Sequence, residues 1–99
     1  MPFEWDSVKA KMNFRKHGVS FDEAQTVFGD MFALTSDDLA HSESEDRERS
    51  VGRSERGRVL VVISVRRAGV IRIVSARPAV RQEVKEYEEE VRRKLVGER

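Results

Sequence analysis

Arginine is the residue type on which chemistry could be built in this chain. Residues 56–85 carry eight basic side chains against a single acid. A guanidinium group suits phosphate, because it donates two parallel hydrogen bonds to one group. The competing interpretation is a solvated sheet face with basic hairpin turns, and composition alone leaves both open. The basic group comprises Arg56, Arg58, Arg66, Arg67, Arg72, Arg77, Arg81 and Lys85.

Arg72 is the most informative member of this group. It is flanked by Ile71 and Ile73 in an apolar segment, and a charge in such a place needs either a partner or a pocket. The sequence leaves these two alternatives open for Arg72. A phosphate site would require the guanidinium groups of the final strand and of the start of the final helix to converge on one pocket that stabilises a pentavalent phosphorus centre. Arg58, Arg66, Arg67, Arg81 and Lys85 are the expected RNA-binding residues.

RNA cleavage needs no metal when the 2′-hydroxyl group is the nucleophile. The protein must then orient that group, neutralise charge on the phosphate and move two protons. His17, Glu83 and Tyr87 are the available proton carriers, and the last two are four residues apart, on one helix face. Two of the three have a structural alternative: His17 can cap the end of a helix, and Tyr87 can simply pack in the core.

Other kinds of site find little support. His17 and His41 have no second histidine at helical spacing, and the acidic segment 37–48 lacks the glycine and spacing of a calcium loop. Ser75 lacks the glycine-flanked turn that exposes a nucleophilic serine. The absence of cysteine excludes a disulfide scaffold and a thiolate metal site. We expect no metal and no cofactor.

The charge pattern indicates two faces of opposite sign. Residues 18–55 carry three basic and ten acidic side chains, a net −7, whereas residues 56–85 carry a net +7. Such a protein can bind a polyanion on one face and a basic partner on the other. The N-terminus lacks a signal-like apolar run, and the longest apolar stretch, 59–65, is too short to span a membrane. We expect a cytoplasmic protein.

The elements that must position these residues can be placed from capping and periodicity. Asp6 and Gly18 bracket a predicted helix over 7–17, and Ser20 with Glu23 resembles a capping box that starts a second helix. The remaining predictions are an edge strand at 3–5, strands at 31–35, 47–53, 58–66 and 70–77, a solvated acidic loop at 36–46, a hairpin turn at 54–57, and a helix from Pro78 to about Leu95.

Two of these elements carry clear apolar faces. In the predicted central strand, Val59, Val61, Ile63 and Val65 line one side, and Leu60 and Val62 the other. In the next strand, simple alternation sets Ile71, Ile73 and Ser75 against Val70, Arg72, Val74 and Ala76. The final helix has one apolar stripe, Val80, Val84, Tyr87, Val91 and Leu95.

These elements predict one α+β domain over residues 1–99. Two N-terminal helices and one C-terminal helix would pack on a four- to five-stranded, mainly antiparallel sheet. A chain of 99 residues is near the size at which one core becomes self-sufficient.

Two separate blocks of this sequence resemble the BrnT family of type II toxins, which have the fold of RelE-like ribonucleases. The first runs Phe3-Glu4-Trp5-Asp6, then Lys9, Asn13, Lys16-His17-Gly18-Val19, Phe21 and Glu23-Ala24. The second runs from Ile71 to Arg77, then Ala79, Arg81, Glu83 and Tyr87-Glu88. The resemblance covers the chain from Phe3 to about Glu88.

The resemblance implies an RNA-cleaving inhibitor of translation. It further implies neutralisation by a BrnA-like antitoxin of the ribbon-helix-helix type, in a complex with two copies of each chain, and contact with operator DNA only through that antitoxin. Among its matching positions, five could do chemistry: His17, Arg72, Arg77, Glu83 and Tyr87. The resemblance implies that Arg72 and Arg77 are the ligands of a phosphate and its transition state, and that the other three are the candidates for proton transfer. The alternative is a non-enzymatic module, an inactive toxin or co-repressor that binds nucleic acid or its partner without breaking a bond.

Overall fold

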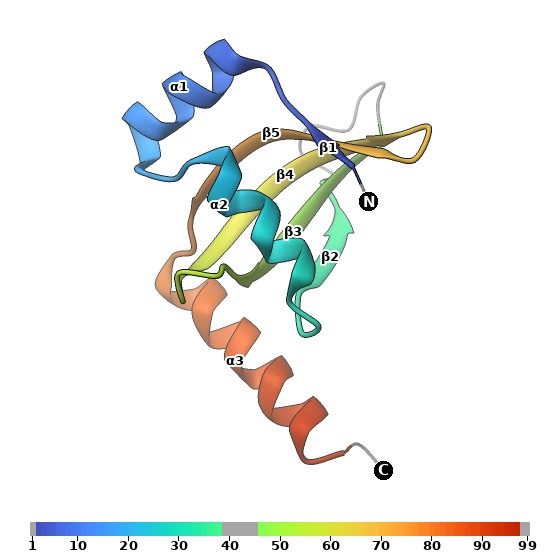
Figure 1. Ribbon diagram of the computed structural model, residues 1–99. Coiled ribbons are helices and arrows are strands. Elements are labelled where there is room, and N and C mark those ends of the chain that lie inside the picture. The colour runs from blue at the N-terminus through green and yellow to red at the C-terminus, as the bar shows by residue number, and fades with distance from the viewer. Residues whose placement is uncertain (1, 39–45, 98–99) are drawn as a thin grey trace.

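The computed structural model describes residues 2–38 and 46–97 (Figure 1). Their elements follow the predicted order of strands and helices, with a short 3₁₀ helix after the second helix. The elements are β1 (Phe3–Glu4), α1 (Ser7–His17), α2 (Phe21–Gln25), η1 (Thr26–Gly29), β2 (Leu34–Asp37), β3 (Arg47–Arg53), β4 (Val59–Arg67), β5 (Val70–Pro78) and α3 (Arg81–Leu95). No helix in the described part of the chain is long and apolar enough to cross a membrane.

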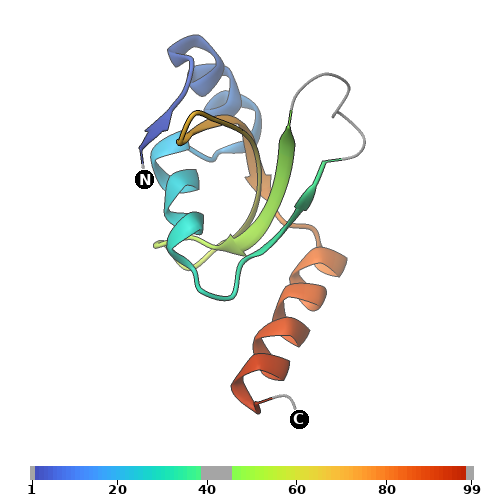
Figure 2. The same ribbon diagram turned by 90° about the vertical axis from the view of Figure 1, so that its right-hand side faces the viewer.

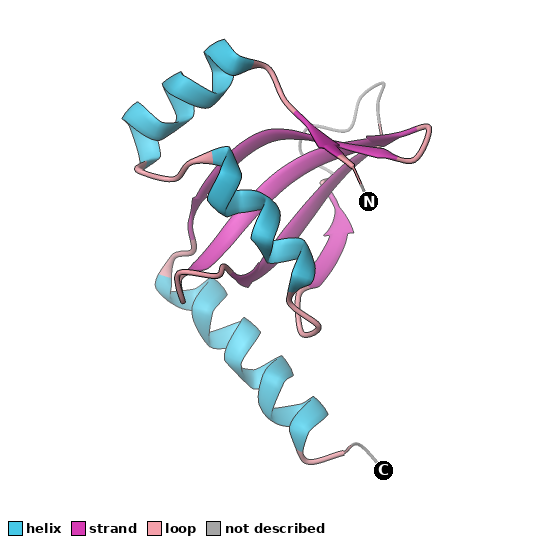
Figure 3. Cartoon of the chain, viewed as in Figure 1, coloured by secondary structure: helices cyan, strands magenta, loops and turns pink. Residues whose placement is uncertain are grey.

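The five strands form one sheet in the order β1-β5-β4-β3-β2 (Figure 3). Strands β2 to β5 are an antiparallel meander, and β1 joins the edge of β5 in parallel. The predicted central strand is therefore central, and the expected α+β fold with a mainly antiparallel sheet is confirmed.

The two faces of the sheet are covered very differently. α1 and α2 lie over one face (Figure 1), where Leu60, Val62 and Ile73 form a core with Phe21 and Val27. On the opposite face, α3 approaches only one end of the sheet and then points away from it (Figure 2). We call this opposite side the open face. Of the apolar stripe predicted for α3, Tyr87 is buried, whereas Val80 and Leu95 are exposed.

A β-bulge in β5 corrects the predicted alternation of that strand. Ile63 pairs with Ser75 and the next residue, Ser64, pairs with Ile73, so that Val74 is an extra residue. After the bulge the sides exchange, and Ala76, not Ser75, joins Ile73 in the core beneath α1 and α2. Arg72 and Arg77 are five residues apart and would alternate to opposite sides of a regular strand. The bulge places both on the open face.

The N-terminal helices begin and end as their capping residues predict. The Asp6 side chain accepts from the N–H groups of Val8 and Lys9, and Gly18 ends α1 in the left-handed conformation. The Ser20 side chain accepts from Glu23 N. The buried Glu23 carboxylate does not complete a capping box, however, and instead accepts from the Ser54 hydroxyl at 2.7 Å and from Arg58.

The strand predicted at 31–35 is misplaced. Asp30 Oδ1 accepts from Phe32 N at 2.9 Å, a local turn that holds the chain away from the sheet until β2 begins at Leu34. Ser36 and Asp37 consequently belong to β2, not to the acidic loop. Most of that predicted loop, including His41, lies outside the described residues.

Candidate functional site

Three charged side chains from three elements meet at one end of the open face. Arg77 of β5 donates to both carboxylate oxygens of Glu83 of α3, each at 2.9 Å. Arg49 of β3 donates to Glu83 Oε2 at 2.6 Å. The Glu83 carboxylate is thus shared by two guanidinium groups. We call Arg49, Arg77 and Glu83 the arginine cluster.

The connection between β5 and α3 fixes the geometry of this cluster. The N–H group of Ala79 donates to Val59 O, which extends the strand pairing by one residue. The N–H group of Val80, at the N-terminal cap of α3, then donates to Glu83 Oε1 at 2.8 Å. Glu83 therefore satisfies the first turn of its own helix while it reaches the two arginines, so that the start of α3 is tied to β3 and β5.

The contact between Arg77 and Glu83 favours the charged form of both groups. The bidentate bond from Arg77 is the largest influence on Glu83, and with the Val80 N–H group and Arg49 it outweighs burial and lowers the pKa of Glu83 to about 2. The same contact raises the pKa of Arg77. A carboxyl group that is ionised at neutral pH holds no proton to donate and is a weak base. Glu83 is therefore placed to orient the arginines.

Both guanidinium groups keep N–H donors that Glu83 does not use. A guanidinium group carries five N–H donors. Arg77 gives three bonds, one to Pro78 O and two to Glu83, and Arg49 gives one. Their side chains are 38% and 34% exposed, so the remaining donors can reach an oxyanion in solvent. The net charge of the cluster, two cations and one anion, is +1.

Arg72 shares the open face with Arg77 but lies apart from the cluster. It donates to Glu4 Oε2 of β1 at 3.2 Å, so the partner that its apolar surroundings required is a carboxylate. The register places Arg77 opposite Val61 and Arg72 opposite Val65, a separation of about 13 Å at 3.3 Å per residue. The expected convergence of Arg72 and Arg77 on one phosphate is therefore wrong, and Arg49 is the residue that converges with Arg77.

Tyr87 lies one helical turn beyond Glu83 and is bonded to a different acid. Its hydroxyl group donates to Asp30 Oδ2 at 2.5 Å, and the Arg53 guanidinium lies 5.6 Å from the centre of its ring. Burial, followed by the bond to Asp30, raises the pKa of Tyr87 to about 12. The phenol is therefore neutral at physiological pH. It lines a pocket of about 520 Å³ with Asp30, Phe32 and Arg53.

His17 lies on another side of β5. It lines a pocket of about 390 Å³ that α1 forms with Val74 and Ser75 of that strand. None of Arg72, Arg77 and Glu83 lines this pocket. The structure brings Arg77 and Glu83 together, therefore, but not His17 or Tyr87 with them.

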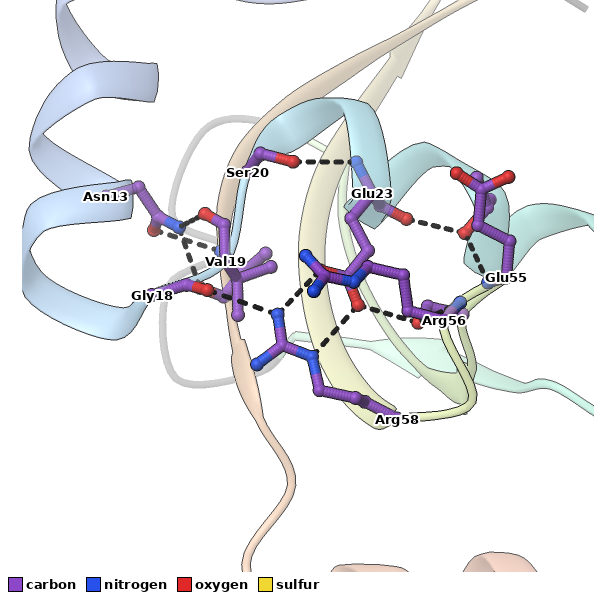
Figure 4. A network of polar contacts seen from close by, with 11 residues as sticks. Asn13, Gly18, Val19, Ser20, Glu23, Glu55, Arg56 and Arg58 are labelled. Atoms are coloured by element: carbon purple, nitrogen blue, oxygen red, sulfur yellow. Dashed lines mark hydrogen bonds and ion pairs between the residues drawn. The ribbon is translucent and has the colours of Figure 1, made fainter.

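The five residues expected to bind RNA are scattered. Arg58 is anchored to Glu23 and to Gly18 O beneath α2 (Figure 4), where it has a structural partner. Arg66 lies 3.6 Å from a carboxylate oxygen of Glu48, and Arg67 is exposed where β4 ends. Arg81 and Lys85 are exposed on α3.

Sequence reasoning missed Arg49 and Asp30. Arg49 stands in a segment where arginine and glutamate alternate with few apolar residues, a pattern that resembles any solvated strand. Asp30 follows Gly29 and looks like a helix stop. A regular alternation of Arg47, Arg49 and Arg53 onto one side of β3 was the signal available for Arg49. The described residues contain no group of three side chains that could hold a metal ion.

Comparison with known proteins connects this chain to a family. The model of the ribonuclease toxin BrnT, of type II toxin-antitoxin systems, matches residues 5–83. Among solved structures, the crystal structure of the Brucella abortus ribonuclease toxin BrnT is similar, with a TM-score of 0.64 and 20% identity over 82% of this chain and 99% of that one. At 20% identity, the similarity to the Brucella abortus structure shows the fold alone. A search of curated proteins returns no match.

Proposed function

Because the chain belongs to the BrnT family of ribonuclease toxins of type II toxin-antitoxin systems, we propose that it cleaves RNA at the arginine cluster without a metal ion. The observation that carries the proposal is the bidentate contact of Arg77 with Glu83, joined by Arg49. It leaves two oriented guanidinium groups, with unused donors, on a solvent-accessible face.

In the proposed reaction the substrate's own 2′-hydroxyl group attacks the adjacent phosphorus, and the 5′-oxygen of the next nucleotide leaves. Negative charge grows on the non-bridging oxygens as the pentavalent centre forms. The unused N–H groups of Arg49 and Arg77 donate to these oxygens, and donors fixed in advance stabilise the transition state most effectively. Glu83 acts as a positioning residue, since it holds both guanidinium groups in place. The products are a 2′,3′-cyclic phosphate and a 5′-hydroxyl end.

Two protons must move in this reaction. His17 is the proposed proton carrier, because it lines a pocket together with Ser75, two residues before Arg77 on the same strand. It would accept the proton of the 2′-hydroxyl group, and a water molecule would donate the proton that the leaving 5′-oxygen takes up. Tyr87 serves the site indirectly, since its bond to Asp30 anchors the turn of α3 that follows Glu83. Arg72, which lies along the open face, would contact the RNA away from the bond that is cut.

Membership of this family supports a proposal for the biological role. We propose that residues 1–99 form one cytoplasmic toxin domain that inhibits translation. A ribbon-helix-helix antitoxin of the BrnA type would neutralise it in a heterotetramer and would carry the contact with operator DNA.

The test is cleavage of RNA by the purified chain, free of its partner, in the presence of EDTA. The wild type should produce 2′,3′-cyclic phosphate ends. Arg77→Ala should slow cleavage by about 10²–10³, the typical cost of removing one transition-state donor, and should restore growth of a host that expresses the chain alone. Arg77→Lys is the matched variant: it keeps the charge but loses the bidentate contact. Cleavage that requires a divalent ion and leaves 5′-phosphates would refute the mechanism.

One observation favours a second candidate, a binding module without catalysis. Glu83 already occupies Arg77 in the manner of a phosphate group, and a cluster satisfied by its own carboxylate can be purely structural. In that case the wild type would bind RNA with steep salt dependence, because phosphate contacts release counterions, but the RNA would stay intact.

A further inference from the structure

Positive charge gathers on α1 as well as on the basic group that the sequence pattern singled out. Four members of that group are paired with carboxylates: Arg58 with Glu23, Arg66 with Glu48, Arg72 with Glu4 and Arg77 with Glu83. The helix α1, by contrast, contains four lysine and arginine residues and no acid. Within the described part of the chain, neither Arg15 nor Lys16 forms an ion pair.

One side of α1 forms a basic pocket with the exposed edge of β5. Lys9, Met12, Asn13, Lys16 and His17 lie at helical spacing, so they share a face. With Arg15 of the same helix and with Val74 and Ser75 of β5, they line the pocket of about 390 Å³. No acidic residue is among its lining residues. The pocket therefore combines three formal positive charges with an imidazole and an exposed apolar side chain, Met12.

The pocket exists because no strand pairs with the outer edge of β5 at this point in the described part of the chain. β1 pairs with β5 only at Ile71 and Arg72, so the edge beyond them is open. The buried Asn13 side chain takes the place of a further strand: its amide donates to Ala76 O at 2.8 Å and accepts from Ala76 N at 3.1 Å. This pairing clamps α1 beside the bulge and sets the basic side chains of the helix at the edge of the sheet.

The same geometry connects the pocket to the arginine cluster. Ser75 and Arg77 pair with Ile63 and Val61, so both point to the open face. They lie two residues apart, or about 7 Å along the strand. A strand of RNA whose phosphate sits at Arg77 would therefore pass the pocket within one or two nucleotides.

We infer that the pocket between α1 and the β5 bulge binds the RNA backbone next to the bond that is cut, with Lys16, Lys9 and Arg15 as phosphate ligands. The inference rests on the proposed ribonuclease function and adds to it a docking site for a flanking phosphate. In this inference the residues of α1, and not Arg58, bind the RNA backbone. RNA is favoured over an acidic protein segment because Arg77, the proposed ligand of a second phosphate, lies two residues from Ser75 on the same strand and the same face.

The test compares Lys16→Ala with Lys11→Ala. Both variants remove one lysine from α1, but Lys11 lines a different pocket, with Asp22 and Phe14. The probe is a fluorescent single-stranded RNA with 2′-O-methyl groups, which lacks the nucleophile and stays intact while anisotropy reports binding. Loss of one phosphate contact reduces the slope of log K against log salt by about 0.7, which weakens binding about fivefold at 0.1 M salt. We expect this for Lys16→Ala, and less than twofold for Lys11→Ala.

The outcomes separate this inference from the proposed function. Equal effects of the two variants, or no measurable binding by the wild type, would overturn the phosphate site even if unmodified RNA is cleaved. Selective loss in Lys16→Ala supports the site even if the wild type cleaves nothing, in which case only the catalytic proposal fails. An oligoglutamate peptide of equal charge is the competitor. If it binds the wild type more tightly than RNA does, and Lys16→Ala weakens it selectively, the site belongs to an acidic protein partner.

Discussion

Replacement of Glu83 by glutamine should destabilise the fold in a manner that depends on pH. Glutamine keeps the shape of the side chain and an oxygen that can accept from Val80 N, but it removes the charge between Arg49 and Arg77. The variant therefore isolates the electrostatic contribution of the cluster. It leaves two guanidinium groups close together without the carboxylate that neutralises them.

The magnitude follows from the lowered pKa of Glu83. The difference between the ordinary pKa of 4.5 and about 2 corresponds to roughly 3.4 kcal/mol as an upper limit. Both arginines are about a third exposed, and solvent screening reduces this to roughly 1–2 kcal/mol. Because the folded protein binds this proton less readily than the unfolded chain, the contribution is complete above pH 4.5 and is lost as the pH falls toward 2.

Urea denaturation at pH 7 and pH 3 measures this effect. At pH 7, Glu83→Gln should lower the free energy of unfolding by about 1–2 kcal/mol, and at pH 3 the difference from wild type should fall to less than half. Glu86→Gln is the control, since Glu86 is exposed on the same helix and should cost less than about 0.5 kcal/mol. If the free energies of unfolding of wild type and Glu83→Gln differ equally at pH 7 and pH 3, Glu83 is not an ionised group that holds the two arginines.

Three further predictions concern the fold that holds the site. Gly52→Ala would place its Cβ 2.9 Å from Val27 Cγ1 and should lower the free energy of unfolding, measured by urea denaturation, by about 1–3 kcal/mol. Gly29→Ala is the control, because its Cβ would meet nothing within 4 Å. Equal losses for the two variants would contradict the packing around Gly52. Tyr87 is the single tyrosine, so absorbance at 295 nm should report a phenol that titrates near 12 in the folded protein and near 10 in urea. The free energy of unfolding should accordingly fall as the pH rises from 10 toward 12. A midpoint near 10 in the folded protein would argue against the buried hydrogen bond. Asn13→Ala removes three hydrogen bonds to the backbone and should lower the free energy of unfolding by about 2–4 kcal/mol; a loss below 0.5 kcal/mol would show that α1 is not held by this amide.

The elements of this fold were readable in the sequence because each has a local cause. Asp6 and Gly18 bracket α1, and the alternating apolar residues of β4 define a strand with two buried faces. The hairpin between β3 and β4 has its glycine, Gly57, at a positive φ of 84°, as a tight turn requires. Capping, periodicity and turn chemistry act over a few residues, so they leave clear patterns.

The site was less predictable because its geometry depends on contacts between distant segments. The bulge at Val74 has no glycine or proline to announce it, yet it decides that Arg77 shares a face with Arg72. Arg49 reaches Glu83 across 34 positions of sequence. The charges of the two segments were visible, but which arginine meets which carboxylate is set by the register of the sheet. Arg77 and Glu83 were both candidate residues in the sequence, but their direct contact was not predicted.

The most direct measurement is the single-turnover rate of RNA cleavage for Arg49→Ala and Arg72→Ala. Both residues lie on the open face and both are paired with a carboxylate, but only Arg49 belongs to the arginine cluster. Arg49→Ala should slow cleavage by about 10²-fold or more, whereas Arg72→Ala should slow it by less than about tenfold, the cost of a weakened contact with the substrate. Equal rates for the two variants, or a larger loss for Arg72→Ala, would contradict the placement of the reaction at Arg49, Arg77 and Glu83.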